Sequence, residues 1–217
     1  MSTKYRSDCY AVIIGAAITA LLAVSGCSLP RVIVLNDPLS AEEHEKLGEA
    51  YESRKEFDLA AQQYREALKK NPQSASLLLL LGDHFFTIKL YPEAESAYLK
   101  ALKLQPENGD IYNNLCWVYL EQHVKKEKSL DLVNAAMAVT PEHRAYYLDT
   151  RGVILLQLGR TSESISDLKE AVLLLPKDNV AYLSEAYTHL AEAYRNAGDV
   201  ENAVEAEKKA DLYRTRP

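Results

Sequence analysis

Small and apolar residues recur along this chain at intervals of 34 or 35 positions from residue 41 onward. The first copy of the pattern comprises Leu47, Gly48, Tyr51, Ala60, Tyr64, Ala67 and Pro72. A shift of 34 positions gives the second copy, which comprises Leu81, Gly82, Phe85, Ala94, Tyr98, Ala101 and Pro106. Two further copies close at Pro141 and Pro176, again five residues after an alanine. Such an interval predicts stacked pairs of helices, and no segment after residue 40 alternates as a strand would.

One position in each copy holds a small residue: Gly48, Gly82, Cys116 and Gly152. We expect the two helices of a pair to approach each other too closely there for a larger side chain. A fifth copy follows in Leu190, Ala191, Tyr194, Ala203 and Ala210 but lacks the closing proline. In it Glu207 replaces a tyrosine or aliphatic residue, which is typical of a polar capping end.

These positions resemble the tetratricopeptide repeat family over residues 41–217. The resemblance implies an all-α fold, a right-handed superhelical array of about five helix-turn-helix units whose groove binds peptides or partner helices. Three departures stand out: Arg151 replaces a leucine, one residue is inserted near 123–128, and the junction before the fifth pair is longer. The approximate units are 41–74, 75–108, 109–144, 145–178 and 179–217.

Local signals agree with helices. Ser40 followed by Glu43 forms a capping box at the first helix. Pro92 suits the first turn of a helix, and Gly159 and Gly198 mark short turns between paired helices.

The N-terminus carries a second pattern. Lys4 and Arg6 precede an apolar run over 11–24, which ends in small residues and Cys27. The run is short for a membrane span, and this order describes a signal peptide over 1–26. It resembles a bacterial lipoprotein signal, which implies lipid attachment at Cys27 and, from Ser28, sorting to the outer membrane. An uncleaved anchor or an ordinary secretory signal is the alternative.

Residues 27–40 are interpreted as the lipidated N-terminus and an extended tether. Its apolar run, 31–35, either docks on the array or lies at the lipid interface. Loss of residues 1–26 leaves 23 Lys and Arg against 30 Asp and Glu, which disfavours nucleic acid as a partner. With Cys9 removed and Cys27 acylated, only Cys116 remains, so no disulfide is expected.

The sequence offers little catalytic chemistry. It contains no phosphate-binding glycine loop, GxSxG elbow, HExxH or CxxC motif. The five histidines are scattered and are interpreted as surface or packing residues. The run Lys125, Lys126 and Lys128 is expected to be solvent exposed. We therefore expect no enzyme activity, no cofactor, no metal and no small-molecule substrate.

The face opposite the packing stripe of each first helix predicts the partner-binding groove. Its first unit forms an acidic entrance of Glu42, Glu45, Glu49 and Glu52. Beyond it the predicted groove residues are Leu79, Asp83, Phe86, Asn113, Asn114, Trp117, Leu120, Asp149, Val153 and Leu156. An apolar strip around the only tryptophan favours a binding hot spot. The alternative is that these side chains pack on neighbouring helices or on the tether.

The resulting hypothesis is a non-catalytic adaptor, anchored in the outer membrane and facing the periplasm, that binds a protein or peptide partner. It is similar to repeat lipoproteins that assist pilus, secretin or outer-membrane assembly. Two alternatives remain: a structural or self-associating envelope protein, and a subunit that delivers substrates to an envelope peptidase.

Overall fold

The computed structural model describes residues 37–215, which contain no strand and fold as ten α-helices and one short 3-10 turn. The first three pairs are α2 (Ala41–Ser53) with α3 (Phe57–Lys70), α4 (Ala75–Thr87) with α5 (Tyr91–Leu104), and α6 (Gly109–Glu121) with α7 (Lys126–Val139). After η1 (Pro141–His143) come α8 (Arg144–Gln157) with α9 (Thr161–Leu174), and α10 (Val180–Asn196) with α11 (Val200–Arg214).

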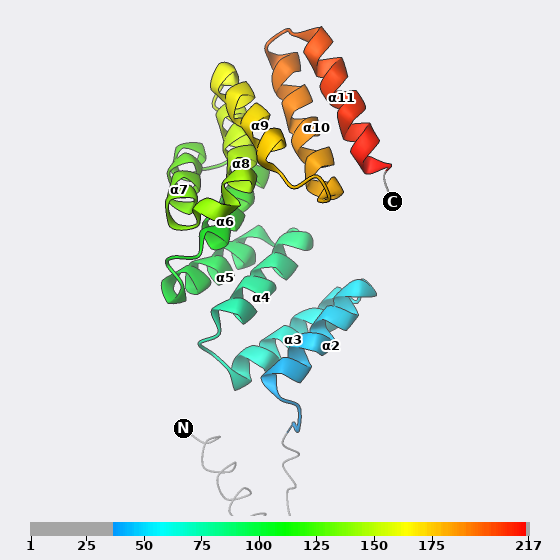
Figure 1. Ribbon diagram of the computed structural model, residues 1–217. Coiled ribbons are helices and arrows are strands. Elements are labelled where there is room, and N and C mark those ends of the chain that lie inside the picture. The colour runs from blue at the N-terminus through cyan, green and yellow to red at the C-terminus, as the bar shows by residue number, and fades with distance from the viewer. Residues whose placement is uncertain (1–36, 216–217) are drawn as a thin grey trace, which may run out of the picture. The chain divides into compact units, whose positions relative to one another are not determined.

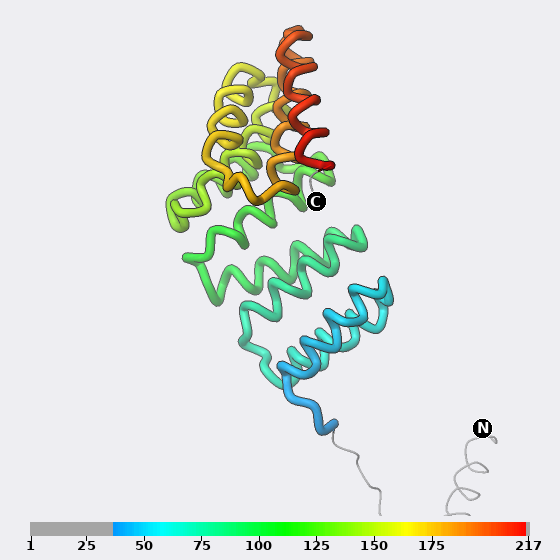
Figure 2. Tube along the Cα trace, turned by 45° about the vertical axis from the view of Figure 1, so that its right-hand side comes forward, coloured from blue at the N-terminus to red at the C-terminus, as the bar shows by residue number. Residues whose placement is uncertain are grey.

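Each helix packs most extensively on its partner in the pair and next on the neighbouring pair. Figure 1 shows the pairs stacked in chain order from α2 and α3 to α10 and α11, and Figure 2 shows that successive pairs are rotated relative to one another. The expected all-α solenoid is therefore confirmed. The predicted lipidation site at Cys27, the predicted signal peptide and most of the predicted tether lie outside the described residues.

Side chains at the helix starts satisfy backbone groups that no helical turn can reach. At α2 the Ser40 hydroxyl accepts a hydrogen bond from the Glu43 amide at 3.2 Å, and the Glu43 carboxylate accepts one from the Ser40 amide at 2.7 Å. At α4 the Ser74 hydroxyl accepts a hydrogen bond from the Leu77 amide at 3.2 Å, and at α6 the Asn108 side chain accepts one from the Asp110 amide at 3.1 Å. Pro92 lies in the first turn of α5, where a missing amide proton costs nothing.

The two helices of a pair meet where a glycine of the first faces a large side chain of the second. A Cβ atom added at Gly48 would lie 2.4 Å from the Tyr64 ring, and one at Gly82 would lie 2.4 Å from the Tyr98 ring. Both rings are buried, at 0% and 1% exposure. The close approach predicted at these positions is therefore present, and it lets a whole aromatic ring fill the space between the helices.

The third and fourth pairs also place a small residue of one helix against the other helix, but with different residues. In the fourth pair Leu168 faces Gly152, where a Cβ would come within 2.5 Å of the leucine. In the third pair Cys116 is fully buried in one cluster with Val133. The Cys116 thiol donates to the Ser129 carbonyl at 3.3 Å. A smaller residue on one helix is thus matched by a larger one on the other.

The turns inside the pairs all contain a residue with a left-handed backbone. Gly159 and Gly198 occupy it with φ of 75° and 78°, as their predicted turn roles require. Lys55 and Lys89 occupy the same place in the first two pairs with φ of 61°. The turn geometry is therefore kept even where the sequence lacks glycine.

The lysine run near the inserted residue is largely exposed and also contacts neighbouring units. The third turn spans 122–125, one residue longer than the others. The Lys125 ammonium lies 2.7 Å from the Glu95 carboxylate and 4.2 Å from the centre of the Tyr119 ring. Lys126 donates to the Gln157 carbonyl at 3.0 Å. Lys125 and Lys128 are exposed, as predicted, and Lys126 is half-buried, while the contacts of Lys125 and Lys126 link the second, third and fourth units.

The other two departures from the repeat also have structural explanations. Arg151, which replaces a leucine, makes a two-fold ion pair with Asp167 of α9 at 2.6 and 2.9 Å. The longer junction before α10 spans 175–179. Its Leu175 is buried and packs against the C-terminal cluster.

The last pair is less polar at its outer surface than a capping end was expected to be. Glu207 does pair with Arg195, as its place on a polar surface suggests. However, Val200 is 70% exposed, and Val204 and Leu212 are also exposed. Within residues 37–215, no helix combines the length and the apolar character needed to cross a bilayer.

We expect Gly82→Ala to destabilise the fold, because the new methyl group would overlap the buried Tyr98 ring. Overpacking of this kind costs about 1–3 kcal/mol in free energy of unfolding. Chemical denaturation followed by circular dichroism measures the change. The control is Tyr98→Val, which imitates the third pair, together with the double variant. The double variant should lose less than the sum of the single changes, and simple additivity would contradict the assigned contact.

Candidate functional site: the concave groove

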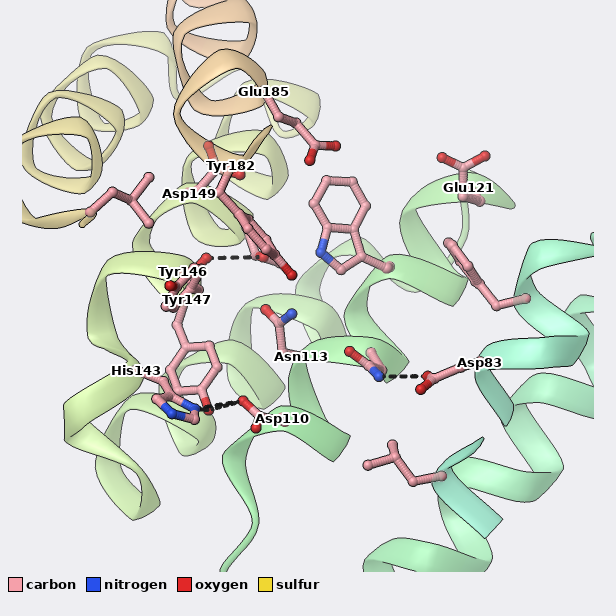
Figure 3. Close-up of a pocket in the computed structure, with 16 residues that line it drawn as sticks. Asp83, Asp110, Asn113, Glu121, His143, Tyr146, Tyr147, Asp149, Tyr182 and Glu185 are labelled. Carbon is pink, nitrogen blue, oxygen red and sulfur yellow. Dashed lines mark hydrogen bonds and ion pairs between the residues drawn. The ribbon is translucent and has the colours of Figure 1, made fainter. Parts of the chain in front are cut away.

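A cavity of about 690 Å³ opens on the concave side, lined by the first helices of four consecutive units. Residues of α4, α6, α8 and α10 contribute to it, together with His143 of η1 and Leu175 after α9. We call this cavity the groove. Figure 3 shows its lining side chains. The loops are at its edges, so rigid helices hold most of its chemistry.

Aromatic rings form much of the groove wall: Phe86, Trp117, Tyr146, Tyr147 and Tyr182. The Tyr146 and Tyr182 rings meet edge to face with centroids 4.8 Å apart. Tyr182 nevertheless remains 51% exposed. Half-exposed aromatic surface on rigid helices is typical of sites that bind another chain.

Five carboxylates share the groove with these rings: Asp83, Asp110, Glu121, Asp149 and Glu185. No lysine or arginine is among its lining residues. Figure 3 shows Asp83 and Asp110 toward one side, with Glu185 and Glu121 farther along the opening. The groove is therefore acidic as well as aromatic.

Four hydrogen bonds that we call the inter-unit bridges join each unit to the next along the concave side. Each has a carboxylate on one first helix, and its partner lies 31 to 40 residues later in the sequence. They are Glu52–His84 at 3.0 Å, Asp83–Asn114 at 2.9 Å, Asp110–His143 at 2.9 Å and Asp149–His189 at 3.0 Å.

The buried tyrosines hold the first two bridging carboxylates in position. The Tyr64 hydroxyl donates to Glu52 at 2.7 Å, and the Tyr98 hydroxyl donates to Asp83 at 2.7 Å. Tyr147 gives Asp110 the same support at 2.7 Å, across units. The packing inside the units thus fixes the polar contacts between them.

Burial raises the pKa of the Asp83 carboxyl, although the hydrogen bonds from Tyr98 and Asn114 act in the opposite direction. The negative charge of Glu52 adds to the increase. The groove therefore places this carboxylate where an additional positive charge would be favourable.

The last bridge lies beside the tryptophan. The centre of the His189 ring is 5.9 Å from that of Trp117. Burial opposes the charged imidazolium, but the hydrogen bond and the charge of Asp149, with Glu185 and Glu192, outweigh it and raise the pKa of His189. His189 therefore holds a proton more strongly in the folded protein than a free histidine does.

One amide atom in the groove has no partner. The Oδ1 atom of Asn113 is buried and makes no hydrogen bond within residues 37–215. Figure 3 shows the Asn113 side chain among the groove residues. It offers a hydrogen-bond acceptor to an incoming group.

Seven of the ten predicted groove residues line the cavity: Leu79, Asp83, Phe86, Asn113, Asn114, Trp117 and Asp149. The other three do not. Leu120 is only 4% exposed and belongs to the core around Cys116, while Val153 and Leu156 pack against core clusters. These placements concern geometry, and a binding role for the seven remains a prediction.

The predicted acidic entrance lies outside the groove. Glu42 pairs with Lys46 of its own helix at 2.6 Å, and Glu52 is used in the first inter-unit bridge. Neither they nor Glu45 and Glu49 line the cavity.

Sequence reasoning missed Tyr146, Tyr147, Tyr182 and Glu185, because it used the same offset in every unit. The groove instead crosses the first helices obliquely: it reaches Phe86 late in α4 but Tyr182 in the first turn of α10. The rotation between successive pairs, visible in Figure 2, accounts for this drift. The available signals were the adjacent Tyr146 and Tyr147 at the start of α8 and the greater length of α10.

In the described part of the chain, no group of three or more His, Cys, Asp or Glu side chains is arranged to hold a metal ion. The histidines among 37–215 that line or border the groove are engaged in the inter-unit bridges.

Comparison with protein families gives the same repeat. A family model described as a tetratricopeptide repeat matches residues 31–75 and 45–109, and a second model with that description matches residues 184–213. These matches cover the first two pairs and the last.

Several characterised proteins are similar over part of their length. The type IV pilus assembly protein PilF of Pseudomonas aeruginosa is 33% identical over 87 residues, covering 39% of this chain and 34% of that protein. The tetratricopeptide repeat-containing protein trd-1 of Caenorhabditis elegans is 26% identical over 135 residues, covering 62% of this chain and 17% of that protein. Human protein O-mannosyl-transferase TMTC3 is 33% identical over 95 residues, covering 44% of this chain and 10% of that protein. The chain thus spans about a third or less of the length of these curated relatives.

Two solved structures share the fold. The type IV pilus biogenesis factor PilW has a TM-score of 0.72 and 18% identity, over 82% of this chain and 79% of that one. TTC0263 of Thermus thermophilus, a thermophilic TPR protein, has a TM-score of 0.67 and 23% identity, over 80% of this chain and 91% of that one. At these identities the likeness concerns the fold alone.

We expect the His189–Asp149 bridge to stabilise the protein more in mild acid than in mild base. Because the folded-state pKa of His189 is raised above 6.5, its contribution is complete below that value and is lost as the pH rises through the folded-state pKa. The loss in free energy of unfolding caused by His189→Gln should therefore be larger near pH 5.5 than near pH 8.5. Denaturant unfolding at both pH values measures it.

Asp149→Asn provides the matched control for this pH dependence, because it removes the charge that raises the pKa of His189 while keeping an amide in place. In that background burial, which lowers the pKa of His189, is no longer outweighed by Asp149, so His189→Gln should not cost more near pH 5.5 than near pH 8.5. An equal cost at both pH values in the unmodified background would show that the bridge does not favour the imidazolium.

Proposed function

Because this chain belongs to the tetratricopeptide-repeat family, whose stacked helix pairs leave a concave surface free, we propose that it is a non-catalytic adaptor that binds a segment of a protein partner in the groove. The observation that carries the proposal is the line of aromatic side chains across four units, in a cavity of about 690 Å³. Such a length of rigid, partly exposed surface suits a peptide or a helix better than a compact metabolite.

The geometry gives each group a role in this binding. The rings of Phe86, Trp117 and Tyr182 supply apolar area at low conformational cost. The amides of Asn113 and Asn114 lie beside them, and Asn113 retains a buried acceptor for a backbone or side-chain donor. The inter-unit bridges support the groove floor, so little ordering is needed when a partner enters.

We propose further that a lipid on Cys27 anchors the adaptor to a bacterial membrane, with Ser28 favouring the outer membrane and a periplasmic location. The support is the sequence: two basic residues, an apolar run over 11–24 and small residues directly before the cysteine. Acyl chains contribute about 0.8 kcal/mol per buried methylene, so several chains hold a protein at the membrane.

The similarity to PilF and the fold likeness to PilW favour a role in type IV pilus assembly or a related envelope assembly. PilF and PilW are named for type IV pilus assembly and biogenesis, and this suggests the pathway that we propose. The proposed mode of binding rests on the groove residues of this chain alone.

Photo-crosslinking tests the adaptor function. A photoreactive amino acid replaces Trp117 in the full-length protein in its native cells, and mass spectrometry identifies the adducts. We expect one reproducible envelope protein, crosslinked through a defined segment. Intramolecular adducts alone would mean that the chain fills its own groove, and the adaptor proposal would then fail.

Two controls accompany that experiment. The same photoreactive residue at Glu201, an exposed position on α11 outside the groove, should not yield this adduct. Trp117→Ala combined with Phe86→Ala should abolish copurification of the identified partner while the circular-dichroism spectrum stays unchanged. Retained copurification would remove the groove from the mechanism.

The anchor is tested separately. Cys27→Ser should move the protein from the membrane to the soluble fraction and abolish metabolic labelling with a radioactive fatty acid, because serine offers no thiol for acylation. Cys116→Ser is the matched control, since Cys116 is fully buried between helices. Membrane association and labelling that persist in the Cys27 variant would refute lipidation at that residue.

A further inference from the structure

The groove carries an unbalanced charge. Its five carboxylates face no lysine or arginine among the lining residues. Asp110 and Asp149 have histidine partners, and Asp83 has only neutral donors. Unlike the outer faces of α7, α9 and α11, where carboxylates and cations are interspersed, this surface presents one sign of charge.

Two of the five carboxylates have no cationic partner and stand near the opening. Glu121 accepts only a hydrogen bond from Tyr91 at 3.2 Å, and Glu185 makes no ion pair with any residue of 37–215. Figure 3 shows both carboxylates at the edge of the groove, on opposite helices. They lie where an entering cation would meet them first.

The aromatic rings of the groove have no lysine or arginine over them in the described part of the chain. Elsewhere in the described chain, lysine or arginine lies over Phe85, Tyr119 and Tyr187. No such contact is present for Trp117, Tyr146 or Tyr182 within 37–215. No lysine or arginine of the described chain therefore competes for the rings of Trp117 and Tyr182, although the His189 ring already lies 5.9 Å from that of Trp117.

Two smaller observations agree with a positive occupant. The buried Oδ1 of Asn113 needs a donor, and ammonium, guanidinium and backbone N–H groups all supply one. The pKa of Tyr182 is raised, first by burial and then by the negative charges of Glu185, Asp110 and Asp83. The middle of the groove is thus under a negative potential.

We propose that the partner segment is positively charged, with lysine or arginine side chains that lie against Trp117 and Tyr182 and reach Glu121 and Glu185. This inference rests on the proposed adaptor function and specifies its partner. An acidic segment would meet five carboxylates and no lysine or arginine among the lining residues, and a purely apolar one would leave the buried Asn113 acceptor unpaired.

Trp117 makes the test direct, because it is the only tryptophan in the chain and reports on the groove alone. Three synthetic peptides of about a dozen residues share the same leucine and alanine positions and carry arginine, glutamate or serine at the remaining ones. Each is titrated into the protein while tryptophan fluorescence is recorded. We expect a saturable change with the arginine peptide and none with the glutamate peptide.

Charge-neutral variants identify the residues responsible. Glu121→Gln and Glu185→Gln should each weaken binding of the arginine peptide about threefold, and together about tenfold, as expected for partly exposed ion pairs. The matched control is Glu93→Gln with Glu201→Gln, which removes two exposed charges outside the groove and should leave the affinity unchanged. Binding should also weaken from about 0.01 M to about 1 M salt, as the Debye length falls from about 30 to about 3 Å.

The outcomes separate this inference from the proposed function. Equal or tighter binding of the serine or glutamate peptide would overturn the positive partner while leaving the adaptor intact. Failure of the arginine peptide to bind would also overturn it, and the adducts at position 117 would then show whether the groove still binds a partner. A saturable change with spermidine that matches the arginine peptide would reassign the groove to a small polyamine.

Discussion

The close approach of the two helices in each unit is the contact on which the rest of this structure depends. At Gly48 and Gly82 there is no room for even one additional carbon atom, and the rings of Tyr64 and Tyr98 fill the space. A ring held this firmly also fixes its hydroxyl group. The apolar packing between two helices therefore decides where a polar atom emerges on the concave side.

That polar atom connects the units. The tyrosine hydroxyls orient Glu52 and Asp83, which in turn bond to His84 and Asn114 of the following units. The sequence of contacts thus runs from a glycine to a ring, from the ring to a carboxylate, and from the carboxylate to the neighbouring unit. Because Asp83 also lines the groove, a contact that joins two units also contributes to the electrostatic character of the groove.

The repeat made the fold predictable from sequence, because its constraint is local and recurs. Each glycine, alanine and proline reports the packing of its own pair, so the helices and their close contacts could be placed without any long-range information. The positions of Gly48 and Gly82 were sufficient to predict the contacts that the structure shows.

The groove was predictable only in part, because it depends on how successive units are rotated. A fixed offset located Trp117 and its neighbours but placed Leu120 at the surface, where the structure buries it. Tyr182 was missed because the groove drifts toward the start of the first helix from unit to unit. The partnership of Asp149 with His189, 40 residues apart, likewise could not be inferred from helical spacing within one segment.

The inter-unit bridges also have a mechanical consequence. Each bridge joins only adjacent units, and other polar contacts such as Lys126–Gln157 cross the same junctions. A tensile load applied along the array would act on every junction between units at once, and the weakest junction would open first. The array would then extend mainly at its weakest junction before any helix unwinds.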